Sequence, residues 1–252
     1  MDMASNRDSW INIIKSLREI IPYYDLMNKI ISLNRDVRYR VEGLRMIVRG
    51  GEIMLDAGSG PGILTLIAFK IGVLESILLD PLTEMHFEAR KRMKNIKNIH
   101  SVIGVFEHPP FRENVFNIIG CAFSIRDSRN IVKATRMLTE KLKPNGCILI
   151  VEIGKPENPI LNIILHIYWR FIIPIIAIIV VGRKWRKYIA LGETYLKLPK
   201  NSQLKKHLKK LYKVVVFKEK LLGGALIAIG KFKNNPCREK NKRLYNYITG
   251  LK

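Results

Sequence analysis

Leu-Asp-Ala-Gly-Ser-Gly-Pro-Gly, residues 55–62, is the stretch of this chain that decides its fold. It follows the apolar run Ile53 to Ala57, which predicts a strand, and it opens a segment that predicts a helix. Glycines in such a turn let the backbone approach a ligand closely, with a polar group of the ligand at the helix N-terminus. Taken alone, the turn is compatible with a dinucleotide, with S-adenosylmethionine, or with a tight connection that binds nothing.

Short apolar strands alternate with helices on both sides of this turn, a pattern typical of an α/β fold with a parallel sheet covered by helices. Two later runs flank a Gly-Gly turn and predict a terminal antiparallel hairpin. The remaining parallel strands are predicted at Ser76 to Leu79, Ser101 to Val105, Asn117 to Phe123 and Cys147 to Glu152, and the hairpin strands at Lys213 to Lys218 and Ala225 to Phe232.

Two segments outside the alternating pattern are helical. Residues 10–48 predict a helix interrupted at Pro22 and a second one from about Asp25 to Val48. The very apolar run Ile160 to Gly182 is followed by Arg-Lys-Trp-Arg-Lys. Arg170 and Pro174 leave only 12 uncharged residues, 171–182, whereas a membrane-spanning helix takes about 20. The run therefore favours a lid or an interfacial helix.

Composition restricts the partners and the compartment. The 252 residues carry 44 Lys and Arg against 21 Asp and Glu, a formal net charge of +23 that favours nucleic acid or anionic lipid headgroups. Cys121, Cys147 and Cys237 lie far apart, which excludes a disulfide framework and a recognisable zinc site, so no metal is expected. The N-terminus has no secretory signal pattern, and we expect a cytoplasmic protein.

Charged side chains are predicted at the carboxyl edge of the sheet, where open α/β folds bind their ligands. Asp80 ends the second strand at the place of a ribose-binding acid, although an Asp before Pro81 is also good turn chemistry. Arg126 and Asp127 follow the fourth strand, either facing reacting atoms or forming a surface ion pair. Tyr24 and Asn28 share one helical face.

Three further strings carry a resemblance to a known family. They are Tyr-Asp-Leu-Met-Asn-Lys-Ile-Ile-Ser (24–32), Phe-Ser-Ile-Arg-Asp (123–127) and Leu-Lys-Pro-Asn-Gly-Cys-Ile-Leu-Ile-Val-Glu-Ile-Gly-Lys-Pro (142–156). With residues 55–62 they resemble the S-adenosylmethionine-dependent C-methyltransferases of ubiquinone and menaquinone biosynthesis (the UbiE/MenG type). The resemblance covers about 24–232 and implies a Rossmann-like class I methyltransferase sheet, an N-terminal helical cap (1–48), a methyltransferase domain (49–232) with an apolar lid insertion (160–187), and a basic tail (233–252).

The resemblance also implies site residues. Tyr24, Arg126 and Asp127 would be catalytic, organising a water or base beside the acceptor. Asp127 stands where the family has Asn, and Val105 stands where the family has an Asp that holds adenine, which leaves backbone groups near Phe106 as substitutes. Glu152 and Lys155 close the last signature. The cofactor-binding residues implied are Asp56, Gly58, Gly60, Gly62, Asp80, Pro81, Phe106, Glu107 and Phe123.

The implied activity is methylation of a ring carbon in a prenylated quinol, at the inner face of an anionic membrane. The apolar insertion and its cations fit that surface, with Trp185 suited to the interface; packing of the insertion on the protein's own core is the alternative. A methyltransferase acting on a sterol, a phospholipid amine or an arsenical is a second reading, and the arsenical is disfavoured without clustered cysteines. An RNA methyltransferase or nucleic-acid binder is a third, which the charge alone permits. A homo-oligomer stays open.

Overall fold

A computed structural model describes residues 11, 14–19, 21–186 and 194–231. The start of the predicted cap (1–10), the last residue of the predicted insertion (187) and the basic tail (233–252) lie outside the described residues.

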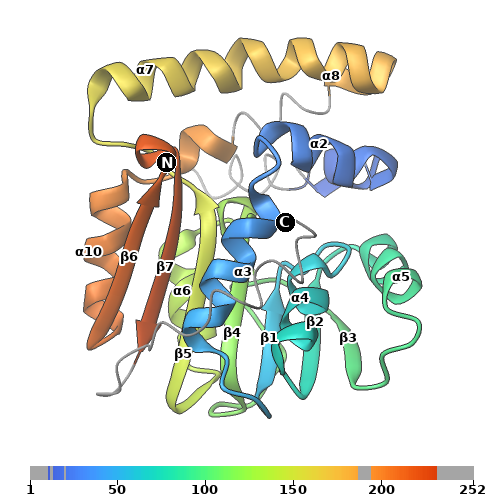
Figure 1. Cartoon of the computed structure of the whole chain (residues 1–252), viewed down its shortest axis with the longest axis vertical. Coiled ribbons are helices and arrows are strands. Elements are labelled where there is room, and N and C mark those ends of the chain that lie inside the picture. Colours follow the sequence, from blue (N-terminus) through green and yellow to red (C-terminus); the bar gives the residue numbers. More distant parts are fainter. Residues whose placement is uncertain (1–10, 12–13, 20, 187–193, 232–252) are drawn as a thin grey trace, which may run out of the picture.

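A seven-stranded sheet in the order β3-β2-β1-β4-β5-β7-β6 forms the centre of the molecule (Figure 1). The first five strands in the chain pair in parallel, and β7 runs antiparallel to both of its neighbours. The predicted class I methyltransferase sheet with its terminal hairpin is thereby confirmed. The strands are β1 (Ile53–Ala57), β2 (Glu75–Asp80), β3 (Ile99–Ile103), β4 (Phe116–Ala122), β5 (Leu142–Ile153), β6 (Val214–Lys220) and β7 (Ala225–Lys231).

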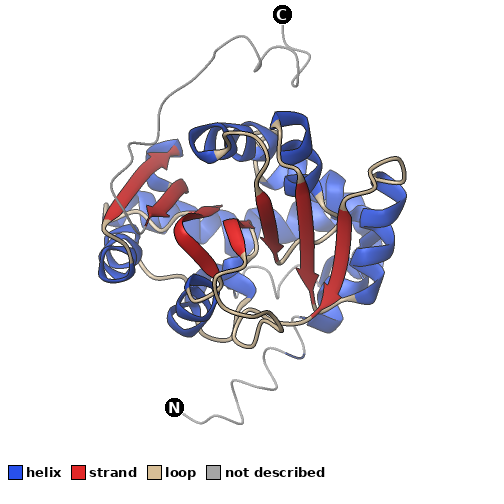
Figure 2. Ribbon diagram, turned by 90° about the horizontal axis from the view of Figure 1, so that it is seen from below, coloured by secondary structure: helices blue, strands red, loops and turns tan. Residues whose placement is uncertain are grey.

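Helices cover both faces of the sheet (Figure 2). On one face α3 (Asp36–Ile47) and α4 (Ile63–Ile71) pack on strand residues such as Met54 and Leu149. On the other face α6 (Ile131–Thr139) and α10 (Asn201–Leu211) pack on the alternate strand residues, such as Leu55 and Ile150. Burial of both faces explains why these strands are apolar throughout rather than alternating. The helix α5 (Thr83–Arg92) follows β2.

The predicted helix from Asp25 to Val48 is wrong in one respect, because the structure divides it into α2 (Tyr24–Ile31) and α3. Leu33 and Asn34 adopt left-handed φ angles of 52° and 58°, which no helix interior contains. The Ser32 hydroxyl accepts a hydrogen bond from the Asp36 backbone amide (3.3 Å), so α3 starts afresh in a new direction. A short 3-10 turn, η1 (Ile21–Tyr23), precedes α2.

The apolar insertion forms a continuous helical run of 23 residues from Pro159 to Val181, made of α7 (Pro159–Ile167), a π-helical turn η3 (Tyr168–Ile172) and α8 (Ile173–Val181). It lies across one end of the molecule above α2 (Figure 1). Arg170 and Pro174 do not interrupt it. Pro174 falls in the first turn after η3, where its missing amide hydrogen leaves no intrahelical bond unmade. The insertion is long and apolar enough to cross a membrane by length and composition alone.

Candidate active site

The loop after β1 is shaped by glycines with left-handed φ angles, a conformation that other residues adopt less readily. Gly58, Gly60 and Gly62 have φ angles of 66°, 50° and 76°. A Cβ on Gly58 would lie 2.5 Å from the Ser124 Cβ, so the loop can approach the start of η2 (Ile125–Asp127) only because this residue is glycine. A Cβ on Gly62 would lie 2.4 Å from the Met93 Cε, which makes Gly62 a packing residue.

Asp56 is buried behind this loop rather than inside the pocket. Its Oδ2 accepts hydrogen bonds from the Thr65 backbone amide (3.1 Å) and hydroxyl (2.7 Å). Burial raises the pKa of Asp56 to about 7 although these bonds lower it. Its carboxyl group thus holds the first turn of α4 against β1, and neither Asp56 nor Gly62 lines the pocket described next.

A narrow pocket, which we call the loop pocket, opens beside Gly58 and Gly60. It brings together seven of the nine residues expected to bind a cofactor, and it adds Val105, Tyr24 and Asp127. Side chains from Ile14 and Leu17 help to close it. The remaining lining residues are Asp80, Pro81, Leu82, Met85, Phe106, Glu107, Phe123 and Ser124.

Two acidic side chains organise the wall of the loop pocket. Asp80 Oδ2 accepts from the Gly60 amide (2.9 Å) and its Oδ1 accepts from the Leu82 amide (2.9 Å), so Asp80 fixes both the glycine loop and the start of α5. Burial raises its pKa. Glu107 Oε1 accepts from the Asn130 amide (3.0 Å), whereas its buried Oε2 has no hydrogen-bond partner among the described residues. The pocket therefore contains an acceptor with unmet capacity.

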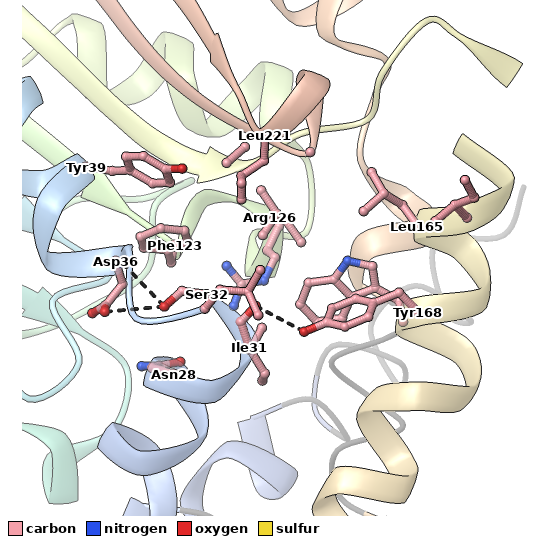
Figure 3. A pocket seen from close by; sticks show the side chains of 16 residues that line it. Asn28, Ile31, Ser32, Asp36, Tyr39, Phe123, Arg126, Leu165, Tyr168 and Leu221 are labelled. Atoms are coloured by element: carbon pink, nitrogen blue, oxygen red, sulfur yellow. Dashed lines mark hydrogen bonds between the residues drawn. The ribbon is translucent and has the colours of Figure 1, made fainter. Parts of the chain in front are cut away.

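A second, apolar cavity of about 240 Å³ lies between α2 and the insertion, and we call it the chamber (Figure 3). Phe123 belongs to both the chamber and the loop pocket, which makes it the shared wall. Its φ angle of 59° turns the chain sharply after β4. The chamber is lined by Asn28, Ile31, Ser32, Leu33, Asp36, Tyr39, Phe123, Arg126, Ile153, Ile164, Leu165, Tyr168, Trp169, Leu221, Gly224 and Ala225.

An ion pair that the sequence interpretation did not anticipate lies at the floor of the chamber. Arg40 Nη1 contacts Asp36 Oδ2 at 2.8 Å, and both side chains are buried. Ser32 Oγ donates to Asp36 Oδ1 at 3.3 Å (Figure 3). The guanidinium of Arg40 lies 4.8 Å from the centroid of the Phe123 ring, an arrangement that fixes that ring. The sequence signal for this ion pair was an acid and an arginine four residues apart on an otherwise apolar helix face.

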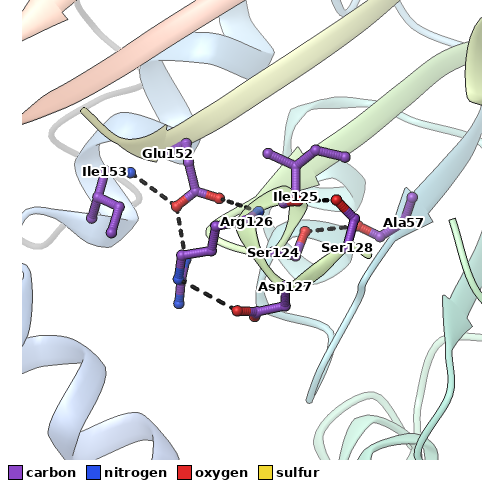
Figure 4. A network of polar contacts seen from close by, with 8 residues as sticks. All are labelled: Ala57, Ser124, Ile125, Arg126, Asp127, Ser128, Glu152 and Ile153. Atoms are coloured by element: carbon purple, nitrogen blue, oxygen red, sulfur yellow. Dashed lines mark hydrogen bonds and ion pairs between the residues drawn. The ribbon is translucent and has the colours of Figure 1, made fainter. Parts of the chain in front are cut away.

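Arg126 forms the centre of a charge network at the junction of the two cavities (Figure 4). Its Nη1 lies 2.7 Å from Glu152 Oε1 and its Nε lies 3.7 Å from Asp127 Oδ1. Glu152 is fully buried at the end of β5 and also accepts from the Arg126 backbone amide (3.3 Å). Burial lowers the pKa of Arg126, but the adjacent Glu152 and then Asp127 raise it by more, so the guanidinium stays charged.

The remaining members of the network are weak acids. Burial raises the pKa of Asp127 to about 6, against the opposing effect of Arg126. Burial also raises the pKa of Tyr24, although Arg126 and a hydrogen bond with Asn28 lower it, so its hydroxyl is neutral at pH 7. The three residues expected to be catalytic are therefore electrostatically coupled to one another and meet beside Phe123. They provide one cation, one carboxyl that titrates near neutrality and one phenol.

The sequence model of the ubiE/COQ5 methyltransferase family matches residues 4–231. The chain belongs to this family. Similar curated proteins include the demethylmenaquinone methyltransferase of Chlorobaculum parvum (31% identity over 63% of this chain and 67% of the relative) and that of Staphylococcus saprophyticus (27% identity over 81% and 88%). The protein is thus an S-adenosylmethionine-dependent methyltransferase, whose relatives act in quinone biosynthesis.

Solved structures agree on the fold. The YcgJ protein of Bacillus subtilis aligns with a TM-score of 0.53 at 21% identity, covering 79% of this chain and 99% of that one. A methyltransferase from Thermotoga maritima, described as a possible histamine N-methyltransferase, aligns with a TM-score of 0.57 at 13% identity, covering 89% and 100%. At these identities the likeness concerns the arrangement of strands and helices.

The lining of the loop pocket offers polar groups that suit the cofactor of the family, although its free volume of about 50 Å³ is too small for the whole cofactor in this conformation. Gly58 packs closely against Ser124 and Phe106, and Glu107 Oε2 offers an unmet acceptor to a hydroxyl or amino donor. Glu107 follows Val105 by two residues and lines the same pocket, so a side-chain acceptor is present although the family's Asp is missing. When bound, the cofactor supplies a methyl group on a sulfonium.

Proposed function

We propose that this enzyme methylates a ring carbon of a prenylated quinol of the demethylmenaquinol type, at the cytoplasmic face of the membrane. The observation that carries the proposal is the pairing of the two cavities through Phe123. The loop pocket is polar on its acidic wall, whereas the adjoining chamber is apolar and roomy enough for a fused ring system. An acceptor in the chamber would meet the methyl donor at this one shared wall.

The charge network supplies what carbon methylation requires. A ring carbon becomes a strong nucleophile when the neighbouring hydroxyl loses its proton. Asp127, with its pKa of about 6, is ionised at neutral pH, and because it lines the loop pocket beside the chamber it accepts that proton through a water. The guanidinium of Arg126, kept charged by Glu152, then stabilises the oxyanion. The ring carbon takes the methyl group, and its own proton then moves by way of water to the ring oxygen, which restores the aromatic ring and the hydroxyl, while the proton on Asp127 leaves to solvent.

The cap also has a place in this proposal. Tyr24 closes the loop pocket, and Asn28 and Ile31 of the same helix wall the chamber. We assign residues 1–48 to a cap that excludes water from the methyl transfer, and residues 49–232 to the methyltransferase domain. Within that domain, the insertion that begins at residue 160 covers the chamber. Water exclusion strengthens the ionic interactions on which the deprotonation depends.

Transfer of labelled methyl groups to a set of extracted acceptors tests the proposal. We expect label in demethylmenaquinol, and the same assay with a ubiquinol precursor, a sterol and a transfer RNA determines the acceptor class. Arg126→Ala should lower kcat/KM by roughly 100-fold or more. The matched control is Arg112→Ala, at an exposed arginine that lines neither cavity, which should leave kcat/KM unchanged. Label only in the sterol or RNA fraction would discard the quinol.

A further inference from the structure

The outward face of the insertion is a continuous apolar surface, which we call the blade. Eight of its isoleucines and phenylalanines are between 46% and 80% exposed. Soluble proteins scatter such side chains singly, and a contiguous set along one helix marks a contact surface. The blade consists of Ile160, Ile163, Ile164, Ile167, Phe171, Ile175, Ile178 and Ile179.

The opposite face of the same helical run is fixed to the protein. Trp169, Ile173, Ala177 and Val181 are buried along it at intervals of four residues. Ala177 and Val181 pack with Met27 of α2, and Trp169 stacks on Tyr195 at 5.7 Å between ring centroids. These contacts fix the second half of the run, from η3 to the end of α8, to the body of the protein, which opposes an upright position across a bilayer. The blade is then immersed with the helix axis lying in the plane of a surface.

Charge identifies the kind of surface. Arg170 is exposed at the midpoint of the run, eleven residues from Pro159 and eleven from Val181. A spanning helix would place that charge at the centre of the bilayer, where it is most costly, whereas a helix lying in the interface keeps it among headgroups. Arg183 and Arg186 are exposed just beyond the run, and the chain carries +23 overall. Anionic lipid headgroups complement these charges.

Independent support comes from three leucines at the rim of the chamber. Leu33, Leu221 and Leu222 have φ angles of 52°, 50° and 54°, a region that a branched apolar side chain normally avoids in favour of glycine or asparagine. Leu33 and Leu221 line the chamber, and Leu222, next to them, is 79% exposed. In water these residues combine backbone strain with apolar exposure. Contact with hydrocarbon would offset both.

The rim leucines and the insertion adjoin each other. A Cβ on Gly224, which follows the turn η5 (Leu221–Gly223), would lie 3.3 Å from a terminal methyl of Leu165 in α7. Leu165 and Leu221 both line the chamber (Figure 3). One side of the chamber is therefore bounded by apolar groups from α7, η5 and the turn after α2.

We propose that the blade lies in the headgroup–hydrocarbon boundary of an anionic bilayer. The gap between Leu33, Leu165 and the η5 leucines is then the port through which the isoprenoid tail of a lipid-borne acceptor passes into the membrane. The docking part stands on the blade and its cations alone, and the port rests on the proposed function. Only the ring then enters the chamber, and the tail stays in lipid.

Vesicle flotation with purified protein tests docking. The triple variant Ile163→Ser, Ile167→Ser, Ile179→Ser removes three exposed blade residues, each worth about tenfold in partition, so binding to vesicles with about 30% anionic lipid should fall by roughly 1,000-fold. The matched control is Leu74→Ser, at a residue 55% exposed before β2 at the opposite edge of the sheet, which should bind as the unaltered protein does. Two results would overturn the proposal. One is equal vesicle binding by the triple variant and the unaltered protein. The other is an unaltered protein that does not bind vesicles but forms a stable dimer, which the triple substitution dissociates.

The port is tested by Leu222→Gly. Glycine accepts a positive φ without strain, so the thermal midpoint should stay the same or rise, and loss of fold cannot explain a kinetic effect. We expect the KM for a long-chain acceptor in vesicles to rise about tenfold, since one leucine leaves the hydrocarbon, and the KM for a tail-less ring analogue to stay unchanged. Equal changes for both acceptors would refute the port. Vesicle binding without any quinol methylation would keep the docking and discard the proposed function.

Discussion

The partnership of Glu152 and Arg126 leads to a quantitative prediction. Glu152 is fully buried, and the Arg126 side chain is only 10% exposed. Glu152→Gln keeps the shape but leaves the guanidinium with Asp127, 3.7 Å away, as its remaining ion-pair partner among the described residues. Breaking a buried pair costs about 3–5 kcal/mol. The amide oxygen of Gln can still accept one hydrogen bond, so we expect about 3 kcal/mol, a fall of roughly 6–12 °C in Tm.

Removing both charges should cost less than removing one. In Glu152→Leu combined with Arg126→Met the buried cation is gone, and apolar groups of similar volume fill the space, which is often neutral for stability. The double variant should therefore be more stable than Glu152→Leu alone, although it lacks activity. Urea titration of the four proteins gives the coupling energy. As a control, Glu140→Gln loses an exposed pair with Arg136 (3.8 Å) and should change the unfolding free energy by less than about 0.5 kcal/mol.

The same substitution has a kinetic signature that a purely structural role would lack. The negative charge of Glu152 contributes to the raised pKa of Asp127. In Glu152→Gln the acid limb of the kcat/KM profile should therefore move to lower pH, while the maximum rate falls. Strictly additive stability effects, or an acid limb that stays in place, would refute the assignment of Glu152 as the residue that positions Arg126 and tunes its neighbour.

Three further results are expected. Gly58→Ala should abolish cofactor binding measured by calorimetry and destabilise the fold by about 1–3 kcal/mol more than Gly51→Ala, whose φ of 83° is nearer to that of Gly58 (66°) and whose added Cβ meets nothing within 4 Å. Since the pKa of Asp127 is raised to about 6 in the folded protein, from about 4 when unfolded, the folded state binds more protons in that interval and loses stability as the pH rises through it. Asp127→Asn removes this pH-dependent loss of unfolding free energy. Urea titrations should therefore find the variant about 3 kcal/mol more stable than the unaltered protein above about pH 6, and equally stable below about pH 4. Arg40→Met leaves the buried carboxylate of Asp36 without its ion-pair partner, and urea titration should find the unfolding free energy lower by about 3 kcal/mol.

The elements whose signals are local could be predicted from the sequence. The strand β1 and its glycine turn follow from an apolar run and from residues that tolerate positive φ. The division between α2 and α3 was missed because it depends on Leu33 in a left-handed conformation, which a leucine in the sequence does not indicate; the local signals were Asn34 and the acid Asp36 in the first turn of α3.

The site was predictable to the extent that it depends on sequence strings. Arg126 and Asp127 come from one string, and the structure brings them together with Tyr24. The partner of Arg126 depends on the register of β4 and β5, in which Ala122 pairs with Val151 and so carries Glu152 to the network. No local pattern determines such a register. The orientation of Asp56 toward Thr65 is likewise a matter of packing.

The short helix α2 forms part of the wall of both cavities. Tyr24 closes the loop pocket, while Asn28 and Ile31 wall the chamber, and α8 and Arg92 of α5 hold the helix in place. The free volume of the loop pocket is about 50 Å³, far below the several hundred that a small-molecule site occupies, so α2 has to move for the cofactor to bind. Because α2 also walls the chamber, the same movement would open the chamber. Under the proposed function the affinities for donor and acceptor are then reciprocally linked.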